Sequence, residues 1–313
     1  MDRYNRRDFF KISGAAAGAA ALGLHCGGGE GETEWAGFKY AMCNESMQGK
    51  SWEEQCDIIG RAGYQGVEIA AFTLVEQGVG EISAARRAEM VTAMKNAGIE
   101  CVGLHWLLAP PPEGLHFTTP DEVVRKKTVA YLDELIDFCG DLGGTAMIFG
   151  SPKQRNTMGI SIQEASANFA DGLAAVADHA QARGVKILVE PLDKTQTDVT
   201  NTLAEAVEVI KKVDHPAIQT MFDFHNTPDE TEPFDVLIRK YYDYIHHIHV
   251  QEMDGRHLGT GDAVDTFVQG FQTLKDLGFN EWVSLEVFDF TPGGKIIAEE
   301  SIRVLRQIES KLS

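Results

Sequence analysis

The chain has 313 residues, 43% of them hydrophobic, which is enough for one large core. Its formal net charge is −19, which argues against nucleic acid as a partner because phosphate binding needs a basic surface. Its five cysteines form no CxxC pair and resemble neither a zinc cluster nor a disulfide framework.

The chain begins with a basic and apolar leader. Arg6 and Arg7 precede Phe9, Phe10 and Lys11, and an Ala- and Gly-rich run follows. This run is too short to span a bilayer as a permanent helix. The combination resembles a twin-arginine export signal, which directs proteins that are exported after folding.

We therefore expect residues 1–36 to form a twin-arginine signal peptide and a flexible linker, and residues 37–313 to form the folded domain. The mature protein is expected in the periplasm or another extracytoplasmic compartment. Cleavage near 19–21 would release it from its leader. Lipidation of Cys26 is the alternative, and it is the one route by which we expect a membrane partner.

Beyond the leader, eight short apolar runs alternate with segments of helical periodicity. The predicted strands are residues 38–43, 66–70, 100–105, 145–150, 186–191, 218–224, 244–250 and 282–288. Several of the helical segments end in glycine just before the next strand, which is a common helix stop. The pattern predicts an α/β fold with a single (β/α)₈ TIM barrel, and a doubly wound open sheet is the alternative.

In such a barrel the chemistry lies at the carboxyl ends of the strands. Side chains alternate along each of the last four predicted strands, so each strand has one mainly apolar face that suits packing against helices. The other faces end in Glu190, Asp223, His249 and Glu286. Three carboxylates at one rim repel each other without a cation, so we expect these four residues to bind one divalent metal ion. Such ligands suit Mn²⁺, our first expectation, and also Mg²⁺, Co²⁺ or Zn²⁺.

Further candidates for substrate binding follow the earlier strands. His105 and Trp106 end the third predicted strand, and Trp106 is suited to stacking on a sugar face. Lys153 and Arg155 follow the fourth and could bind a carboxylate, phosphate or hydroxyl group. His247 lies on the same strand face as His249 but one layer deeper, where we interpret it as a supporting or core histidine.

Two acidic residues near the amino-terminal strands are weaker candidates for the same pocket. Glu45 follows the first predicted strand, and Glu68 lies within the second.

The motifs at the last four strand ends resemble those of a known family. Glu-Pro-Leu at 190–192, Phe-Asp-Phe-His-Asn at 222–226, His-Ile-His-Val at 247–250 and Leu-Glu-Val at 285–287 are each one β/α unit apart. They resemble the xylose-isomerase-like TIM-barrel superfamily, in particular its sugar isomerase and epimerase branch, which includes D-tagatose 3-epimerase and hydroxypyruvate isomerase. The resemblance implies that Glu190 and Glu286 bind the metal and also flank the substrate as an acid/base pair.

The sequence departs from this family at three positions. The family's histidine comes three residues after the strand-six aspartate, whereas His225 comes two residues after Asp223. The arginine after strand seven is displaced and corresponds to Arg256. Gln196 replaces a glutamate six residues after the strand-five ligand. We expect His225 and Arg256 to contact the substrate.

These residues predict an enzyme that moves a proton next to a carbonyl through a metal-stabilised enediolate, a sugar isomerase or epimerase. The expected substrate is a keto-sugar or a related hydroxy-carbonyl compound, and a homo-oligomer is compatible with the sequence. The first alternative is a 3-keto-glycoside lyase with the same metal site. Two others are an endonuclease-IV-like phosphodiesterase and a non-catalytic exported sugar-binding protein.

The leader gives the first testable prediction. Changing Arg6→Lys together with Arg7→Lys should hold the protein in the cytoplasm, because the twin arginine is the recognised element of the signal. Fractionation of cells that express the tagged full-length chain measures this. A variant that is exported as efficiently as the native chain would disprove the twin-arginine assignment.

Overall fold

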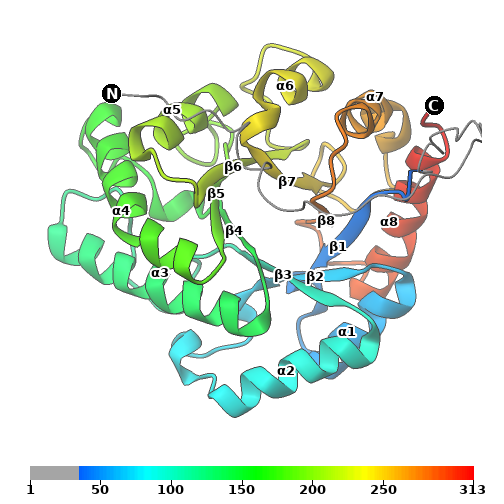
Figure 1. Cartoon of the computed structure of the whole chain (residues 1–313), viewed down its shortest axis with the longest axis horizontal. Coiled ribbons are helices and arrows are strands. Elements are labelled where there is room, and N and C mark those ends of the chain that lie inside the picture. The colour runs from blue at the N-terminus through cyan, green and yellow to red at the C-terminus, as the bar shows by residue number, and fades with distance from the viewer. Residues whose placement is uncertain (1–34) are drawn as a thin grey trace, which may run out of the picture. The chain divides into compact units, whose positions relative to one another are not determined.

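Eight parallel strands pair in chain order and close into a barrel, with β8 hydrogen-bonded to β1. The strands are β1 Lys39–Cys43, β2 Gly66–Ala70, β3 Glu100–His105, β4 Ala146–Phe149, β5 Lys186–Val189, β6 Ile218–Asp223, β7 Ile245–Val250 and β8 Trp282–Leu285. A helix follows each strand, and the helices surround the barrel (Figure 1). The predicted (β/α)₈ architecture is therefore confirmed.

The eight helices are α1 Trp52–Ala62, α2 Ala84–Ala97, α3 Glu122–Leu142, α4 Ile162–Ala182, α5 Leu203–Val213, α6 Phe234–Tyr241, α7 Ala263–Asp276 and α8 Gly294–Glu309. Short 3₁₀ segments lie in the connections at Asn44–Met47, Ala71–Thr73, Val79–Glu81, Pro152–Gln154 and Tyr242–Tyr244.

The computed structural model describes residues 35–313, and Gly37–Ser313 form one compact unit. The predicted signal peptide lies outside the described residues, as does all of the predicted linker except residues 35 and 36. Within the described part of the chain, no helix has the length and apolar character needed to cross a membrane.

Local sequence signals fix the ends of several helices. At the start of α1, the Ser51 side chain accepts a hydrogen bond from the Glu54 backbone N–H, and the Glu54 carboxylate accepts one from the Ser51 backbone N–H at 2.8 Å. Gly63, Gly98 and Gly143 follow α1, α2 and α3 in left-handed conformations, with φ of 106°, 72° and 84°. Glycine tolerates this conformation without steric cost, so the predicted glycine stops are confirmed.

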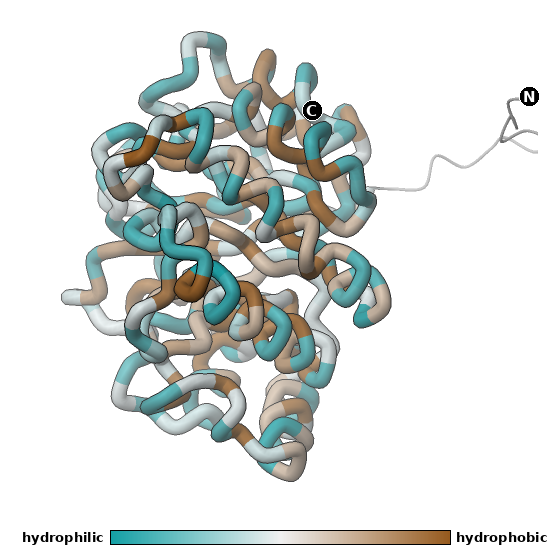
Figure 2. The backbone as a smooth tube through the Cα atoms, turned by 90° about the vertical axis from the view of Figure 1, so that its left-hand side faces the viewer, coloured by the Kyte–Doolittle hydropathy of each residue, from teal (hydrophilic) through white to brown (hydrophobic). Residues whose placement is uncertain are grey.

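Apolar side chains fill the space inside the barrel and the space between strands and helices. Neighbouring strands contribute a buried cluster that shares one face of the sheet: Ala146, Ile148, Leu188 and Met221. Leu188 and Met221 share the strand faces of Glu190 and Asp223, as the alternation of side chains predicts. Figure 2 shows hydrophilic and hydrophobic positions alternating along the helices, as expected for helices that bury one side.

The register of the last strands brings their carboxyl ends to one level. Asp223 on β6 pairs directly with His249 on β7, and Val250 pairs with Leu285 on β8. Neighbouring strands lie about 4.8 Å apart, so polar groups at paired positions are close enough to share a ligand. The register of the sheet therefore places polar side chains from neighbouring strands together at the carboxyl-end rim of the barrel.

Four strands end earlier than predicted, at Phe149, Val189, Asp223 and Leu285. On β5, the Glu190 N–H still donates to the Phe149 carbonyl oxygen at 3.2 Å, but the next residue is Pro191, which has no N–H to continue the ladder. Beyond β8, the Phe288 N–H donates to the carbonyl oxygen of Gly255 in a neighbouring loop, at 2.8 Å. Loop contacts thus replace strand pairing at the rim.

Candidate metal centre and active site

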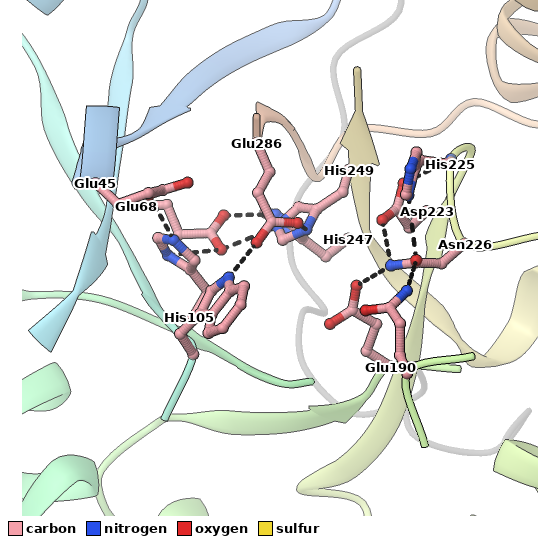
Figure 3. Close-up of polar contacts among 12 residues, drawn as sticks. Glu45, Glu68, His105, Glu190, Asp223, His225, Asn226, His247, His249 and Glu286 are labelled. Atoms are coloured by element: carbon pink, nitrogen blue, oxygen red, sulfur yellow. Dashed lines mark hydrogen bonds and ion pairs between the residues drawn. The ribbon is translucent and has the colours of Figure 1, made fainter. Parts of the chain in front are cut away.

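Four polar side chains meet at the carboxyl-end rim of the barrel (Figure 3). Asp223 and His249 lie on β6 and β7, and Glu190 and Glu286 follow β5 and β8 directly. One potential ligand atom from each lies within 4.8 Å of those of the others, and all four side chains are buried. We call these four residues the rim tetrad. The structure thus brings together the four residues that the sequence predicts as metal ligands.

Two acidic residues fix the orientation of His249. Its Nε2 lies 3.0 Å from Glu68 Oε1, and its Nδ1 lies 3.1 Å from Glu286 Oε2. Glu68 comes from β2 and is fully buried, and its second oxygen, Oε2, lies 2.8 Å from His247 Nε2. If Nε2 carries the proton and donates to Glu68, the Nδ1 lone pair faces the other members of the tetrad. Such a carboxylate–histidine contact is the usual way to orient a metal-ligating imidazole.

The acid–base properties of the rim reflect the crowding of its charges. Burial, followed by the charge of Glu286, raises the pKa of Glu190 to about 8. Burial also raises the pKa of Asp223. These carboxylates are therefore poorly stabilised as anions by the protein alone. Three carboxylates and one imidazole at this spacing fit a divalent cation, which would supply the missing positive charge.

Glu286 is held on the side of the tetrad nearest β3. The indole Nε1 of Trp106 donates a hydrogen bond to Glu286 Oε1 at 2.7 Å. Trp106 has a φ of 51°, a rare conformation for a bulky residue, and it follows β3 directly. The sequence suggested that Trp106 stacks on a sugar, and the structure gives its polar edge a contact with a rim carboxylate.

Behind Trp106, His105 and Glu45 form a buried pair. His105 Nε2 lies 2.8 Å from Glu45 Oε2. Burial alone would lower the pKa of His105, but the charges of Glu45, then Glu68 and Glu286, outweigh it and raise the pKa to about 9. At neutral pH this imidazolium supplies positive charge to the acidic rim. Contact with Glu45 thus occupies one ring nitrogen of the predicted substrate-binding residue His105.

Glu190 is held by an amide that sequence reasoning did not single out. Asn226 Nδ2 donates to Glu190 Oε1 at 3.0 Å and to Asp223 Oδ2 at 2.7 Å, and the side chain is buried. Gln196 Nε2 donates in turn to Asn226 Oδ1 at 2.8 Å. One amide therefore bridges two of the carboxylates (Figure 3). Asn226 lies three residues after Asp223, where the family has a histidine, and this position is the sequence feature that could have indicated its role.

The remaining predicted substrate-binding residues lie in different settings. Trp106 and His225 line a cavity of about 660 Å³ beside the tetrad. Lys153 is exposed and lies outside the lining of this cavity. Arg256 is also exposed and outside the lining, and its Nε and Nη2 both lie 2.7 Å from Asp254 Oδ2.

Arg155 is fully buried, unlike the basic loop that the sequence suggests. Its Nη1 donates to the Phe149 carbonyl oxygen at 3.1 Å and its Nη2 to the Thr200 carbonyl oxygen at 3.4 Å. Burial lowers its pKa to about 10. The guanidinium therefore connects the end of β4 to the loop before α5, and it does not line the cavity.

Comparisons with known proteins agree with this geometry. The Xylose isomerase-like TIM barrel family matches residues 56–308, and the twin-arginine translocation signal family matches residues 3–23. A probable ketose 3-epimerase from Synechocystis sp. is 27% identical over 224 residues, which cover 63% of this chain and 74% of that protein. A D-psicose 3-epimerase from Ruminiclostridium cellulolyticum is 23% identical, over 88% of this chain and 89% of that protein.

Solved structures show the same fold. D-psicose 3-epimerase from Clostridium cellulolyticum H10, solved with D-tagatose, has a TM-score of 0.71 and 22% identity, covering 88% of this chain and 92% of that chain. A 3-keto-D-glucoside 4-epimerase from E. coli has a TM-score of 0.74 and 18% identity, covering 86% and 99%. The predicted export signal and the predicted isomerase or epimerase class are confirmed. The chain belongs to the Xylose isomerase-like TIM barrel family.

Proposed function

We propose that the protein is a divalent-metal-dependent sugar isomerase or epimerase that transfers a proton at a carbon next to a carbonyl group. The observation that carries this proposal is the placement of Glu190 and Glu286 within one buried cluster but on separate strand ends, with different hydrogen-bond donors. Asn226 holds Glu190, whereas Trp106 holds Glu286. The relatives named as ketose 3-epimerases support a small carbohydrate as the substrate.

The rim tetrad would hold the metal, and we propose Mn²⁺, with Mg²⁺, Co²⁺ or Zn²⁺ as substitutes. When bound there, a divalent cation would lower the pKa of a C–H next to a carbonyl by stabilising the negative charge that develops on the oxygen. His249 supplies the nitrogen donor, and Glu68 keeps its ring in place through Nε2. Trp106 and Asn226 each donate to one oxygen of a glutamate and thereby fix the orientation of the two carboxylates.

Two carboxylates on different sides of a substrate carbon can together invert the configuration at that carbon. One of the pair Glu190 and Glu286 removes the proton, and the other returns a proton from the opposite side. Return to the same carbon gives epimerisation, whereas return to the neighbouring carbon gives isomerisation. Burial of both side chains limits the access of water to the deprotonated substrate.

We also propose that the enzyme works outside the cytoplasm, where free sugars and glycosides are more available than sugar phosphates. The match to the twin-arginine signal family supports export. A periplasmic protein without a nucleic-acid partner fits the net charge of −19. A lipid on Cys26 would instead keep the protein at a membrane surface, and self-association would be compatible with either location.

The metal proposal predicts the behaviour of two ligand variants. Asp223→Ala and His249→Ala should each lose bound metal, because either change removes one of four donors. Elemental analysis of the Mn²⁺-loaded and dialysed proteins measures this, and circular dichroism should show an intact barrel. His246→Ala is the matched control, because His246 lies on the same strand but on the opposite face. Stoichiometric metal in the Asp223 or His249 variant would contradict the tetrad.

The amide bridge predicts a second effect on metal binding. Asn226→Ala should weaken metal affinity by about 10- to 100-fold, because residues that orient metal ligands typically contribute this much. Metal titration by calorimetry measures it without any substrate. Thr227→Val is the matched control, since it removes a neighbouring hydroxyl that bonds to the Phe224 carbonyl oxygen. Equal affinity in the Asn226 variant and the native protein would remove the proposed positioning role.

Proton exchange tests the reaction itself. The metal-loaded protein should incorporate deuterium from D₂O into ketoses or keto-glycosides at the carbon next to the carbonyl, as detected by NMR. Glu190→Gln and Glu286→Gln should keep most of the metal but lose about 10²–10⁴ in rate, the usual cost of losing a general base. Glu89→Gln, at an exposed position on α2, is the control for the change in charge.

The two glutamine variants also separate the reaction types. In an epimerase, each variant should fail mainly with one of the two epimers, because each glutamate serves one face of the carbon. An isomerase would lack this reciprocal pattern. Normal exchange rates in either metal-loaded glutamine variant would rule out the paired-carboxylate mechanism.

A further inference from the structure

The cavity beside the rim tetrad extends well beyond the four proposed ligands. It has a volume of about 660 Å³, and none of the four tetrad residues lines it. It adjoins the tetrad through Trp106, which donates to Glu286, and through Gln196, which donates to Asn226. Cavities of about 300–1,000 Å³ typically hold ligands of drug-like size. A single sugar at the tetrad would leave much of this volume empty.

One part of the cavity wall is apolar and largely aromatic. It consists of Phe72, Trp106, Met253, Val287, Phe288 and Phe290. Met253, Phe288 and Phe290 are 41%, 40% and 37% exposed, which is unusual for large apolar side chains that lie next to one another in a cavity. Contiguous exposed apolar surface of this kind marks a place where a ligand or partner binds.

Phe288 is fixed in position even though its ring is partly exposed. Its backbone N–H donates to the Gly255 carbonyl oxygen at 2.8 Å, and its ring packs edge-on against Trp106 and His225, with centroid distances of 6.3 and 5.3 Å. Gly255 has a φ of 80°, and a Cβ there would lie 3.0 Å from Phe288 Cδ2. Glycine is thus favoured at position 255 both by the positive φ and by the closeness of the Phe288 ring. The aromatic surface is preorganised, as a binding surface requires.

The other side chains of the cavity carry hydrogen-bonding groups but little positive charge. They are Glu45, Asp193, Thr195, Gln196 and His225, with Pro228 beside them, and no lysine or arginine is among the described residues that line the cavity. The nearby Arg256 is paired with Asp254, outside the lining. A phosphate group needs cationic or N–H-rich surroundings, so this wall suits a neutral ligand rich in hydroxyl groups.

We propose that the cavity is a subsite for a second, neutral ring of the substrate, joined by a glycosidic bond to the sugar that reacts at the tetrad. Aromatic faces stack on the C–H faces of sugar rings or on aryl rings, while the polar side chains bind hydroxyl groups. The substrate is then a neutral keto-glycoside and not a free or phosphorylated ketose. This inference rests on the proposed function for the placement of the reacting sugar.

Binding of unreactive probes tests the subsite independently of turnover. Calorimetry on the metal-loaded chain should show that phenyl β-D-glucopyranoside binds about tenfold more tightly than methyl β-D-glucopyranoside. Phe288→Ala should remove most of this preference, because one aromatic contact contributes up to about tenfold in affinity. Ile296→Ala is the matched control, because Ile296 is an exposed apolar residue on α8 outside the cavity. Its phenyl preference should equal that of the native protein.

Several results would overturn the subsite. Equal binding of the methyl and phenyl glycosides would do so, even if free ketoses exchange deuterium normally. Tighter binding of phenyl phosphate than of phenyl glucoside would refute the neutral ligand. Absence of a phenyl preference in the native protein, together with a native dimer that Phe288→Ala dissociates, would identify the aromatic wall as an interface between two copies of the chain. A clear phenyl preference without deuterium exchange would instead keep the subsite and reject the proposed reaction.

Discussion

The concentration of buried negative charge at one rim of the barrel is the constraint on which the site depends. The carboxylates buried there include Glu45, Glu68, Glu190, Asp223 and Glu286. Each needs a donor, because a buried carboxylate without one costs several kcal/mol. The fold supplies two imidazoles on Glu68, one on Glu45, an indole on Glu286 and an amide across Glu190 and Asp223. The charge that these donors leave unbalanced is what makes the tetrad suited to a divalent cation.

The fold was predictable because its signals are local and repeat along the chain. Apolar runs and helical periodicity recur in each β/α unit, and several helices end at a glycine such as Gly63 or Gly98. Eight such units leave few alternatives to a barrel. The carboxyl ends of the strands were less predictable. Whether β8 continues to residue 288 depends on Gly255, a distant residue that takes the hydrogen bond of Phe288. The sequence around residues 282–288 does not indicate that Phe288 donates its hydrogen bond to Gly255.

The candidate site was predictable where it follows strand parity and less so where it depends on loops. Glu190, Asp223 and Glu286 were placed by alternation alone, and their role as ligands stays a prediction. The bridging amide of Asn226 depends on how the chain turns after β6. The sequence suggested a basic binding loop around Arg155, but backbone carbonyls from two segments surround that guanidinium, and no local pattern encodes such an arrangement.

Closure of the barrel has a consequence for the order of events during biosynthesis. The export signal precedes the barrel along the chain, whereas β1 obtains its second neighbour only when β8, Trp282–Leu285, has been synthesised. The last member of the tetrad, Glu286, emerges at the same moment. A nascent chain therefore carries its export signal before its barrel sheet can close and before the rim tetrad is complete. An export route for folded proteins suits this order of synthesis, because transport then follows the pairing of β8 with the exposed edge of β1.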